Sequence, residues 1–331
     1  MLAPQTIRAA LPRVGSGRPR LVALGDLVLD IVVTADVEIA TGTDVGGAIS
    51  FRTGGSAANT ARAFAALGGR ATFVGAVGTD ALGRRLVASL RTGGVTTHVA
   101  RAARPTARVV VIIGLGARGE RSFITQRGAA DQLRPADLRA TWFSRTGALH
   151  LPAYSLLREP LASAALTAAA WARAGGALVS VDLASARPLA DAGRRRVQGL
   201  LADVAPDVLF GNVEEARVVA GGHAERSLLA LAPTVVIKEG AEGGRVLWRA
   251  EAGDPASDVL QQTVATRRID TADTTGAGDA FDAGFLHALL SEPDTAPGDG
   301  PRRAAGLRRA ALAGHRAAAA LLSGPRPELT L

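Results

Sequence analysis

Short runs of apolar residues alternate along most of the chain with longer segments in which apolar residues recur at helical spacing. A strand that is buried on both faces is apolar throughout, whereas an amphipathic helix places an apolar residue every three to four positions. We therefore expect strands at 20–25, 71–77, 95–99, 148–151, 177–181, 208–210 and 235–238. Helices are expected at 56–67, 80–91, 157–174, 189–201, 213–220 and 302–322, with a further apolar helix ending at 290. Repeated strand–helix units predict a parallel sheet with helices on both faces.

Two segments have a β pattern of another kind. Residues 31–51 are rich in Val, Ile and Thr and are broken by glycines, which predicts short strands. In the second segment, Gly114-Leu-Gly-Ala-Arg-Gly119 satisfies the dinucleotide pattern G-x-G-x-x-G. That pattern must open a helix, but the following Glu120-Arg-Ser-Phe-Ile-Thr125 alternates and is typical of the second strand of a hairpin. We expect no dinucleotide site here, and a small sheet in which both segments form a lid.

Composition limits the architecture and the cell compartment. At 331 residues, of which 47% are hydrophobic, the chain can form one large α/β domain with a small appendage, or two domains. The absence of cysteine excludes disulfides and a cysteine nucleophile and agrees with a cytoplasmic protein. No apolar run reaches the ~20 residues of a membrane span, so no membrane association is expected. Residues 1–19 are rich in Arg, Pro and Gly, as in a transit peptide, but we expect a disordered leader.

The net charge of +8 raises the question of nucleic-acid binding. Lys238 is the only lysine among 38 basic residues, and the arginines are spread along the chain without interleaved aromatic residues. A coding bias that replaces lysine with arginine explains this distribution better, so we expect no nucleic-acid partner. The five histidines show no metal-ligand spacing and no Ser-His-Asp arrangement, so a hydrolase is not indicated.

The stretch with the most chemistry is Asp270-Thr-Ala-Asp-Thr-Thr-Gly-Ala-Gly-Asp-Ala-Phe-Asp-Ala-Gly-Phe-Leu286, a turn of small residues that enters a helix. Gly276 and Gly278 lack a Cβ, so a ligand can approach the backbone closely. The first N–H groups of a helix have no internal partner and favour an anion. Asp279 beside such an anion is suited to handle a proton, which indicates phosphoryl transfer. An ordinary capped helix is the alternative, because Asp and Gly are common at helix starts.

A second glycine turn enters a helix at Thr53-Gly-Gly-Ser-Ala-Ala-Asn-Thr-Ala-Arg62, and Leu67-Gly-Gly-Arg-Ala-Thr-Phe-Val-Gly-Ala-Val-Gly-Thr-Asp-Ala-Leu-Gly83 follows it. With the first stretch, these segments resemble the two signatures of the ribokinase-like (PfkB) carbohydrate kinase family. The resemblance runs from about Leu21 to about Ser323. It implies a ribokinase-like three-layer α/β fold, with a mostly parallel central sheet, helices on both faces and a small β-sheet lid. Residues 20–29, 54–104 and 129–331 would form the main domain, and residues 30–53 and 105–128 the lid.

The resemblance also implies a function, namely ATP-dependent phosphorylation of a hydroxymethyl group of a sugar or sugar-like substrate. Asp279 would be the catalytic base, and the N–H groups of Gly276, Ala277 and Gly278 would hold the transferring phosphoryl group. A nucleoside kinase of the same family and a non-catalytic sugar- or nucleotide-binding protein on the same fold are the alternatives. Ribose, fructose, a keto-deoxy acid and a nucleoside all remain as substrates. A lid would exclude water during transfer, and a homodimer through the lids is a further expectation from the resemblance.

The resemblance places substrate contacts at the two glycines Gly54 and Gly55, at Asp30 and at Asn59. Asp30 follows the first strand closely, and ligands of open α/β sheets bind beyond the carboxyl ends of strands. A solvated loop acid is the alternative for Asp30. A buried Asn59 needs a hydrogen-bond partner, which either the ligand or loop backbone would supply. Some family members carry Lys where this chain has Ser56, and that difference limits the transfer of substrate identity.

Nucleotide and metal contacts are expected at three other places. Asn212 and Glu215 match the family motif Asn-x-x-Glu, which organises Mg²⁺, often through water, and the phosphates; a helix cap is the alternative. The turn after Lys238, with Gly240 and Gly243, is expected near the ATP phosphates and ribose, with a plain β-turn as the alternative. The resemblance further assigns Asp273 and Thr275 to a monovalent cation, for which K⁺ is the candidate.

Three more polar residues lie next to predicted strands or strand ends. We expect Asp26 to be structural and Asp182, which follows a strand, to be a site acid of undefined role. For Arg127 we favour a surface salt bridge over a contact with an acidic group of the substrate.

Overall fold

The computed structural model describes residues 17–39, 41–113, 121–221, 225–251, 254, 257–271, 273–291, 300–325 and 328–330. Most of the expected leader therefore lies outside the described residues, as does the whole segment Gly114–Gly119 with the dinucleotide pattern. Within the described ranges, two β-sheets organise the chain, one large and one small.

The larger sheet confirms the expected α/β fold. Seven of its strands pair in parallel, whereas β12 is antiparallel to both of its neighbours. The apolar runs form parallel strands because helices cover both faces of the sheet. Its nine strands lie in the order β13 (Val259–Val264), β12 (Gly244–Arg249), β11 (Thr234–Lys238), β10 (Val208–Asn212), β9 (Leu178–Asp182), β8 (Ala148–Pro152), β1 (Arg20–Gly25), β4 (Arg70–Gly78) and β5 (Thr96–Ala102).

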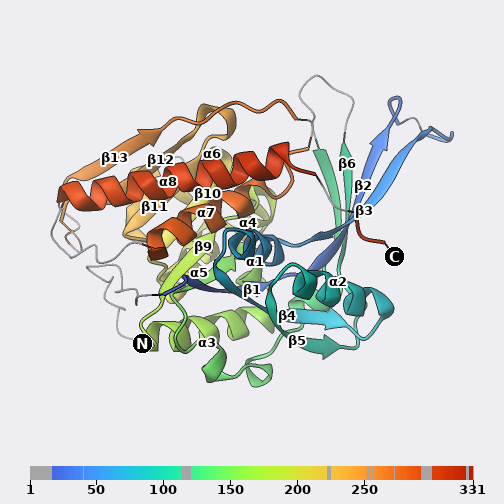
Figure 1. Cartoon of the computed structure of the whole chain (residues 1–331), viewed down its shortest axis with the longest axis horizontal. Coiled ribbons are helices and arrows are strands. Elements are labelled where there is room, and N and C mark those ends of the chain that lie inside the picture. Colours follow the sequence, from blue (N-terminus) through green and yellow to red (C-terminus); the bar gives the residue numbers. More distant parts are fainter. Residues whose placement is uncertain are drawn as a thin grey trace.

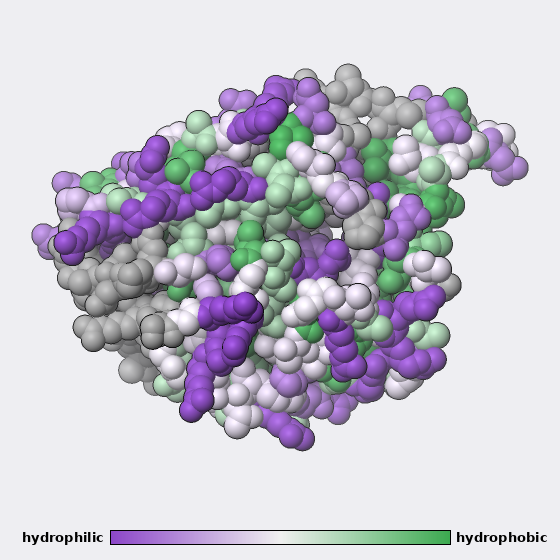
Figure 2. All heavy atoms as spheres, viewed as in Figure 1, coloured by the Kyte–Doolittle hydropathy of each residue, from purple (hydrophilic) through white to green (hydrophobic). Residues whose placement is uncertain are grey.

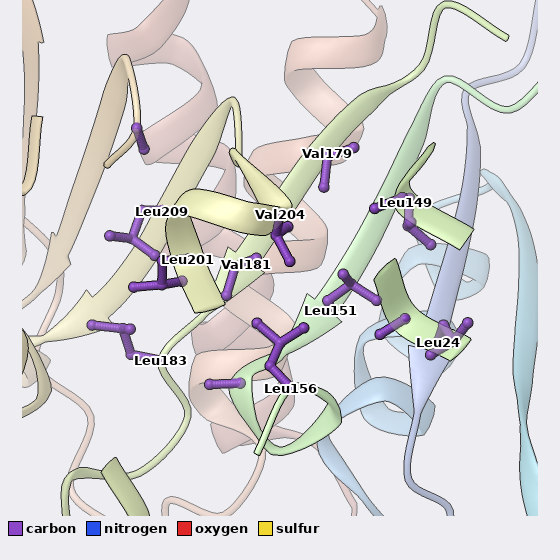
Figure 3. Packing of buried hydrophobic residues seen from close by; sticks show 14 of the residues in the cluster. Leu24, Leu149, Leu151, Leu156, Val179, Val181, Leu183, Leu201, Val204 and Leu209 are labelled. Carbon is purple, nitrogen blue, oxygen red and sulfur yellow. The ribbon is translucent and has the colours of Figure 1, made fainter. Parts of the chain in front are cut away.

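Helices form a layer on each face of this sheet (Figure 1). One layer contains α1 (Ser56–Ala66), α2 (Ala81–Thr92), α7 (Ala277–Ser291) and α8 (Gly300–Ser323). The other contains α3 (Leu161–Ala174), α4 (Ala186–Ala192), α5 (Arg194–Val204) and α6 (Val213–Ala220). Figure 3 shows strand residues such as Val181 and Leu209 beside Leu201 and Val204 of α5. Short 3₁₀ segments lie at Gly128–Asp131, Pro135–Asp137, Ala140–Trp142, Ala153–Ser155, Glu225–Ala230 and Gly240–Glu242.

Two details of the predicted elements were wrong. The single helix expected at 189–201 is two helices, α4 and α5, because Gly193 between them has φ of 85°, a conformation that a helix interior does not allow. The antiparallel pair β12 and β13 was not predicted at all. Strand β13 has the sequence Val-Leu-Gln-Gln-Thr-Val, and its exposed edge position removes the apolar signal that marks the central strands.

The small sheet has the order β3 (Gly47–Gly54), β2 (Val28–Ala35), β6 (Arg108–Ile113) and β7 (Arg121–Gln126). Strands β6 and β7 pair antiparallel, as expected for a hairpin, and β2 lies parallel to β6. The sheet projects from one side of the main body, next to α2 (Figure 1). Strand β2 begins at Val28 and strand β3 ends at Gly54, so both extend slightly beyond the expected lid segment 30–53.

Candidate active site

Polar residues stand at the carboxyl ends of four parallel strands of the larger sheet. Asp26 follows β1, and Asp182, Asn212 and Lys238 are the last residues of β9, β10 and β11. The starts of α1 and α7 lie at the same edge, because side chains of α1 bond to Asp279 in the first turn of α7. The two glycine turns that were singled out in the sequence therefore meet in space, although more than 200 residues separate them.

The carboxylate of Asp279 is held by two donors from α1. The Ser56 hydroxyl donates to Oδ1 at 2.6 Å, and the Asn59 amide donates to Oδ2 at 2.9 Å. Burial raises the pKa of Asp279 to about 7, although the bonds from Ser56 and Asn59 lower it. Such a group is ionised in part at neutral pH and can accept a proton there. Asn59 thus has a partner in the site, and Ser56 is the first residue of α1, directly after the N-cap residue Gly55.

The turn before α7 is shaped by Gly276, whose φ of 77° favours glycine. Its carbonyl accepts the N–H of Ala280 at 2.9 Å, which starts the helix. The N–H of Ala277 donates to the carbonyl of Thr274 at 3.2 Å, so this expected phosphoryl donor already serves the turn. Gly278 lies above Lys238, since a Cβ at Gly278 would be 3.3 Å from the Lys238 Nζ.

Lys238 is the centre of a buried charge cluster. Its Nζ lies 2.9 Å from Asp182 Oδ1 and 3.2 Å from Asp282 Oδ1. Burial by itself would lower the pKa of Lys238, but the charges of Asp182, Asp282 and Glu215 raise it above its ordinary value. Burial, together with the charge of Asp182, raises the pKa of Asp282 well above its ordinary value. Sequence reasoning missed Asp282, although an acid among the apolar residues of this helix, one turn after Asp279, was a usable signal.

Asn212 and Glu215 form a reciprocal cap at the start of α6, as in the alternative interpretation. Asn212 Oδ1 accepts the Glu215 N–H at 2.9 Å, and Glu215 Oε2 accepts the Asn212 N–H at 2.8 Å. Glu215 is buried, and burial followed by the charge of Asp182 raises its pKa to about 7. In the described ranges, no group of three or more His, Cys, Asp or Glu residues could hold a metal ion.

Gly240 and Gly243 lie in the tight turn that joins β11 to β12. The Glu239 N–H donates to the carbonyl of Gly243 at 2.9 Å, and the Gly243 N–H donates to that of Gly240 at 3.2 Å. These two hydrogen bonds close the turn directly after Lys238, so both glycines lie in a tight turn, as in the alternative interpretation.

Asp30 lies in β2, directly opposite Arg52 of β3. Its carboxylate packs onto the bare backbone of Gly54, where a Cβ would come within 2.1 Å of Oδ2. Burial, and then the negative charges of Asp26 and Asp279, raise the pKa of Asp30 to about 7. Gly54 therefore provides the space that Asp30 occupies, which was not evident from the sequence.

The salt bridge that was favoured for Arg127 is present, but it is largely buried and not on the surface. Its Nη1 lies 2.9 Å from Asp26 Oδ2, its Nη2 2.8 Å from Asp131 Oδ1, and its side chain is only 15% exposed. The guanidinium also lies over the ring of Tyr154, 5.1 Å from the centroid. Asp26 further accepts the N–H of Ala57 at 3.3 Å, in agreement with its expected structural role. The bridge joins the segment before β2 to the end of β7, where the small sheet meets the main body.

Asp273 and Thr275 lie together in the loop before α7. The Thr275 N–H donates to Asp273 Oδ1 at 3.0 Å, and the guanidinium of Arg52 pairs with Asp273 Oδ2. Arg52 comes from the small sheet, and no sequence motif pointed to it.

The site thus combines the hydrogen-bonded carboxylate of Asp279 at the start of α7, the cluster of acids around Lys238 and the adjacent small sheet. Comparison with known proteins identifies the family. The family model described as pfkB family carbohydrate kinase matches residues 18–327. The chain belongs to this family of carbohydrate kinases. Fructokinase-1 of Zea mays is 31% identical over 297 residues, which cover 85% of this chain and 86% of that protein.

Solved structures of related kinases have the same fold as this carbohydrate kinase. Adenosine kinase from Sinorhizobium meliloti is 25% identical, with a TM-score of 0.77 over 94% of this chain and 96% of that one. Fructokinase from Vibrio cholerae O395, with bound fructose, ADP and calcium ion, is 25% identical, with a TM-score of 0.70 over 92% and 93%. The resemblance stated from the sequence motifs, to the ribokinase-like family and its fold, is confirmed. In the described part of the kinase no helix is long and apolar enough to cross a membrane.

Proposed function

We propose that this kinase transfers the γ-phosphoryl group of ATP to a hydroxymethyl group of a sugar or sugar-like substrate, with Asp279 as the base. The observation that carries the proposal is the Asp279 carboxylate at the start of α7, fixed by Ser56 and Asn59 and with a pKa of about 7. Asp279 takes the hydroxyl proton, the freed oxygen bonds to the γ-phosphorus, and the bond to the bridging oxygen of ADP breaks. The N–H groups of Gly276 and Gly278 face the developing charge at the helix start, with Ala277 completing the turn.

Substrate and nucleotide are proposed to meet at this edge from two sides. Asp30 and Asn59, beside Gly54 and Gly55, would hold substrate hydroxyls on the side of the small sheet. Lys238 and the turn with Gly240 and Gly243 would lie near the ATP phosphates and ribose. The small sheet would act as the lid that excludes water.

Magnesium fits the charge balance of the site. Asp182, Glu215, Asp279 and Asp282 all interact with Lys238, so four carboxyl groups share this one lysine. Mg²⁺ keeps much of its water and needs only one or two protein oxygens besides the phosphates. We propose that Glu215 contacts it through water, with Asn212 as its support. The ion would neutralise charge on the β- and γ-phosphates when bound.

A nucleoside substrate is the second candidate, favoured by the TM-score of 0.77 to an adenosine kinase. ADP release should be measured with ATP and Mg²⁺ across pentoses, hexoses, keto-deoxy acids and nucleosides. One clear substrate, silenced in Asp279→Asn, would support the proposal and decide between sugar and nucleoside. ATP binding without ADP release on any substrate would instead favour a non-catalytic binding protein.

We also propose that the small sheet mediates a homodimer. Three large apolar side chains of its strands are exposed, namely Ile49 at 65%, Phe123 at 54% and Ile124 at 63%. Apolar surface is visible over this sheet in Figure 2.

A cytoplasmic location and the absence of a nucleic-acid partner stay predictions from the sequence.

The pH dependence of kcat/KM tests the hydrogen bond from Ser56. In the wild type, kcat/KM should rise with pH through about 7, because the base must lose its proton. The Ser56 bond stabilises the charged carboxylate, so its removal in Ser56→Ala raises the pKa of Asp279 and moves the acid limb to higher pH. Ser56→Thr keeps the hydroxyl and should follow the wild type. Coincident profiles for Ser56→Ala and the wild type would show that this bond does not tune the base.

Gly54→Ala tests whether the position of the Asp30 carboxylate matters for substrate binding. The new Cβ would meet Asp30 Oδ2 at 2.1 Å, so the carboxylate must move away from its position in the site. We expect KM for the sugar to rise about 10- to 100-fold, as for a lost hydrogen bond to a charged group, with a smaller change in kcat. Gly199→Ala in α5 is the matched control, because nothing lies within 4 Å of its added Cβ. An unchanged KM in Gly54→Ala would remove Asp30 from the substrate site.

A further inference from the structure

Arg52 links the small sheet to the loop that precedes α7. It lies in β3, and its Nη1 pairs with Asp273 Oδ2, a contact that spans 221 positions of the sequence. Its side chain is 23% exposed, and its Nε is buried without a hydrogen-bond partner in the described part of the chain. Because Arg52 is directly opposite Asp30 in the sheet, both side chains lie on the same face, and the charge of Arg52 partly offsets the burial that raises the pKa of Asp30.

The expected monovalent-cation site does not fit the contacts of Asp273. A K⁺ ion is held by several oxygens that replace its water shell. Here Oδ1 of Asp273 accepts the Thr275 N–H, and Oδ2 is taken by the guanidinium. The Asp273 carbonyl also accepts the Thr271 hydroxyl, at 3.4 Å. A cation at this carboxylate would have to displace Arg52 and would meet its positive charge.

We propose that the Arg52 guanidinium takes the place of the monovalent cation beside Asp273, so that the kinase works without K⁺. Arg52 is a positioning residue in this proposal, acting through Asp273 on the turn that carries Gly276 and Asp279. Guanidinium keeps its charge at every accessible pH and donates in fixed directions, so it can hold a carboxylate as an ion does. The contact also depends on the position of the small sheet, because Arg52 belongs to β3.

The inference rests on the proposed function for its turnover measurement, and a second measurement is independent of turnover. Initial rates and melting temperatures are recorded in KCl and in tetramethylammonium chloride at equal ionic strength, which removes general screening effects. The proteins are the wild type, Arg52→Met, Arg52→Lys and Arg187→Met. Arg187 pairs with Asp191 on the surface, and its side chain is 85% exposed. Arg187→Met therefore removes an arginine–aspartate pair away from the site and is the matched control.

For the wild type and Arg187→Met we expect the same rate and the same melting temperature in both salts. Arg52→Met should lose about 100-fold in rate in tetramethylammonium chloride, as for a displaced catalytic loop. Saturating K⁺ or methylguanidinium should restore most of that rate and raise the melting temperature of this variant. Arg52→Lys keeps a positive charge and should remain independent of K⁺.

Three results would overturn the inference. Saturable activation or stabilisation of the wild type by K⁺ would show that a separate cation site exists. An Arg52→Met variant as active as the wild type without K⁺ would show that the guanidinium is not needed. A rate loss that no cation restores, with KM raised for acidic sugars, would make Arg52 a substrate contact instead. If Arg52→Met does not fold, the K⁺ dependence of the wild type and of Arg52→Lys still tests the inference. If no kinase activity is found, the effect of K⁺ on the melting temperatures still shows whether a cation binds beside Asp273.

Discussion

Asp279→Asn is expected to lower kcat about 100- to 10,000-fold, the range that a positioned general base contributes. The amide keeps the shape of the carboxylate beside Ser56 and Asn59 but cannot take the hydroxyl proton. ATP affinity should stay within about twofold, because the base acts on the substrate hydroxyl rather than on the nucleotide. ADP release with the substrate found in the panel, together with calorimetric titration of ATP, measures both quantities.

Thermal unfolding supplies the control for Asp279→Asn. A carboxyl group whose pKa in the folded state is about 7, against 3.8 as its ordinary value, destabilises the fold increasingly as pH rises from about 4, and the cost is complete above about 7. This cost disappears as pH falls through 7 toward 4, since the folded protein then holds the proton. The variant lacks the cost, so it should melt no lower than the wild type at pH 8 and up to ~2 °C higher. An inactive variant that also melts far lower would point to misfolding and not to a lost base.

Lys238→Met is expected to cost about 3–5 kcal/mol of the free energy of unfolding at pH 8, the cost of breaking a buried ion pair by removing one partner. Asp182 and Asp282, at 5% and 0% side-chain exposure, would then be left without their lysine. The loss should be smaller at pH 5, because burial raises the pKa of Asp282 and of Glu215, and both can then take up a proton. Urea unfolding at the two pH values measures the difference.

Two further variants serve as controls for Lys238→Met. The double variant Lys238→Met/Asp282→Asn removes one of the unpaired charges and should recover part of the loss, which a double-mutant cycle quantifies. Arg187→Met breaks an exposed pair and should cost no more than about 1 kcal/mol. Equal stability of Lys238→Met and the wild type at both pH values would mean that the cluster is well solvated and does not contribute to the fold.

Much of the fold could be predicted because local patterns carry it. The strands β1, β4, β8, β9, β10 and β11 of the larger sheet are short, mostly apolar runs, and their alternation with helices of 3.6-residue period allows few architectures. Prediction failed where the local signal was weak or where one residue changed the backbone. β13 has a polar edge pattern, and Gly193 breaks a continuous helical pattern into α4 and α5.

Most residues of the candidate site were singled out from the sequence, with Asp282 and Arg52 as exceptions, but their contacts with one another were not predictable. The glycine turns and Asp279 were visible as motifs, because the chemistry of an anion at a helix start restricts which residues can stand there. Ser56 and Asn59 lie 223 and 220 positions from Asp279, and both can donate to it only because α1 and α7 pack against each other. The position of Asp30 likewise depends on the register of β2 against β3, which places its carboxylate on the backbone of Gly54.

The sequence alone determined the family, the α/β class and the residues that could carry phosphoryl transfer, because motifs and hydrophobic periodicity are properties of neighbouring positions. Only the tertiary structure decided which charges neutralise one another. Folding placed Lys238 against Asp282, Arg127 against Asp26, and Asp273 against Arg52, and the sequence indicated none of these pairs. Electrostatic energy depends on distance through space and on burial, and neither can be read from spacing along the chain.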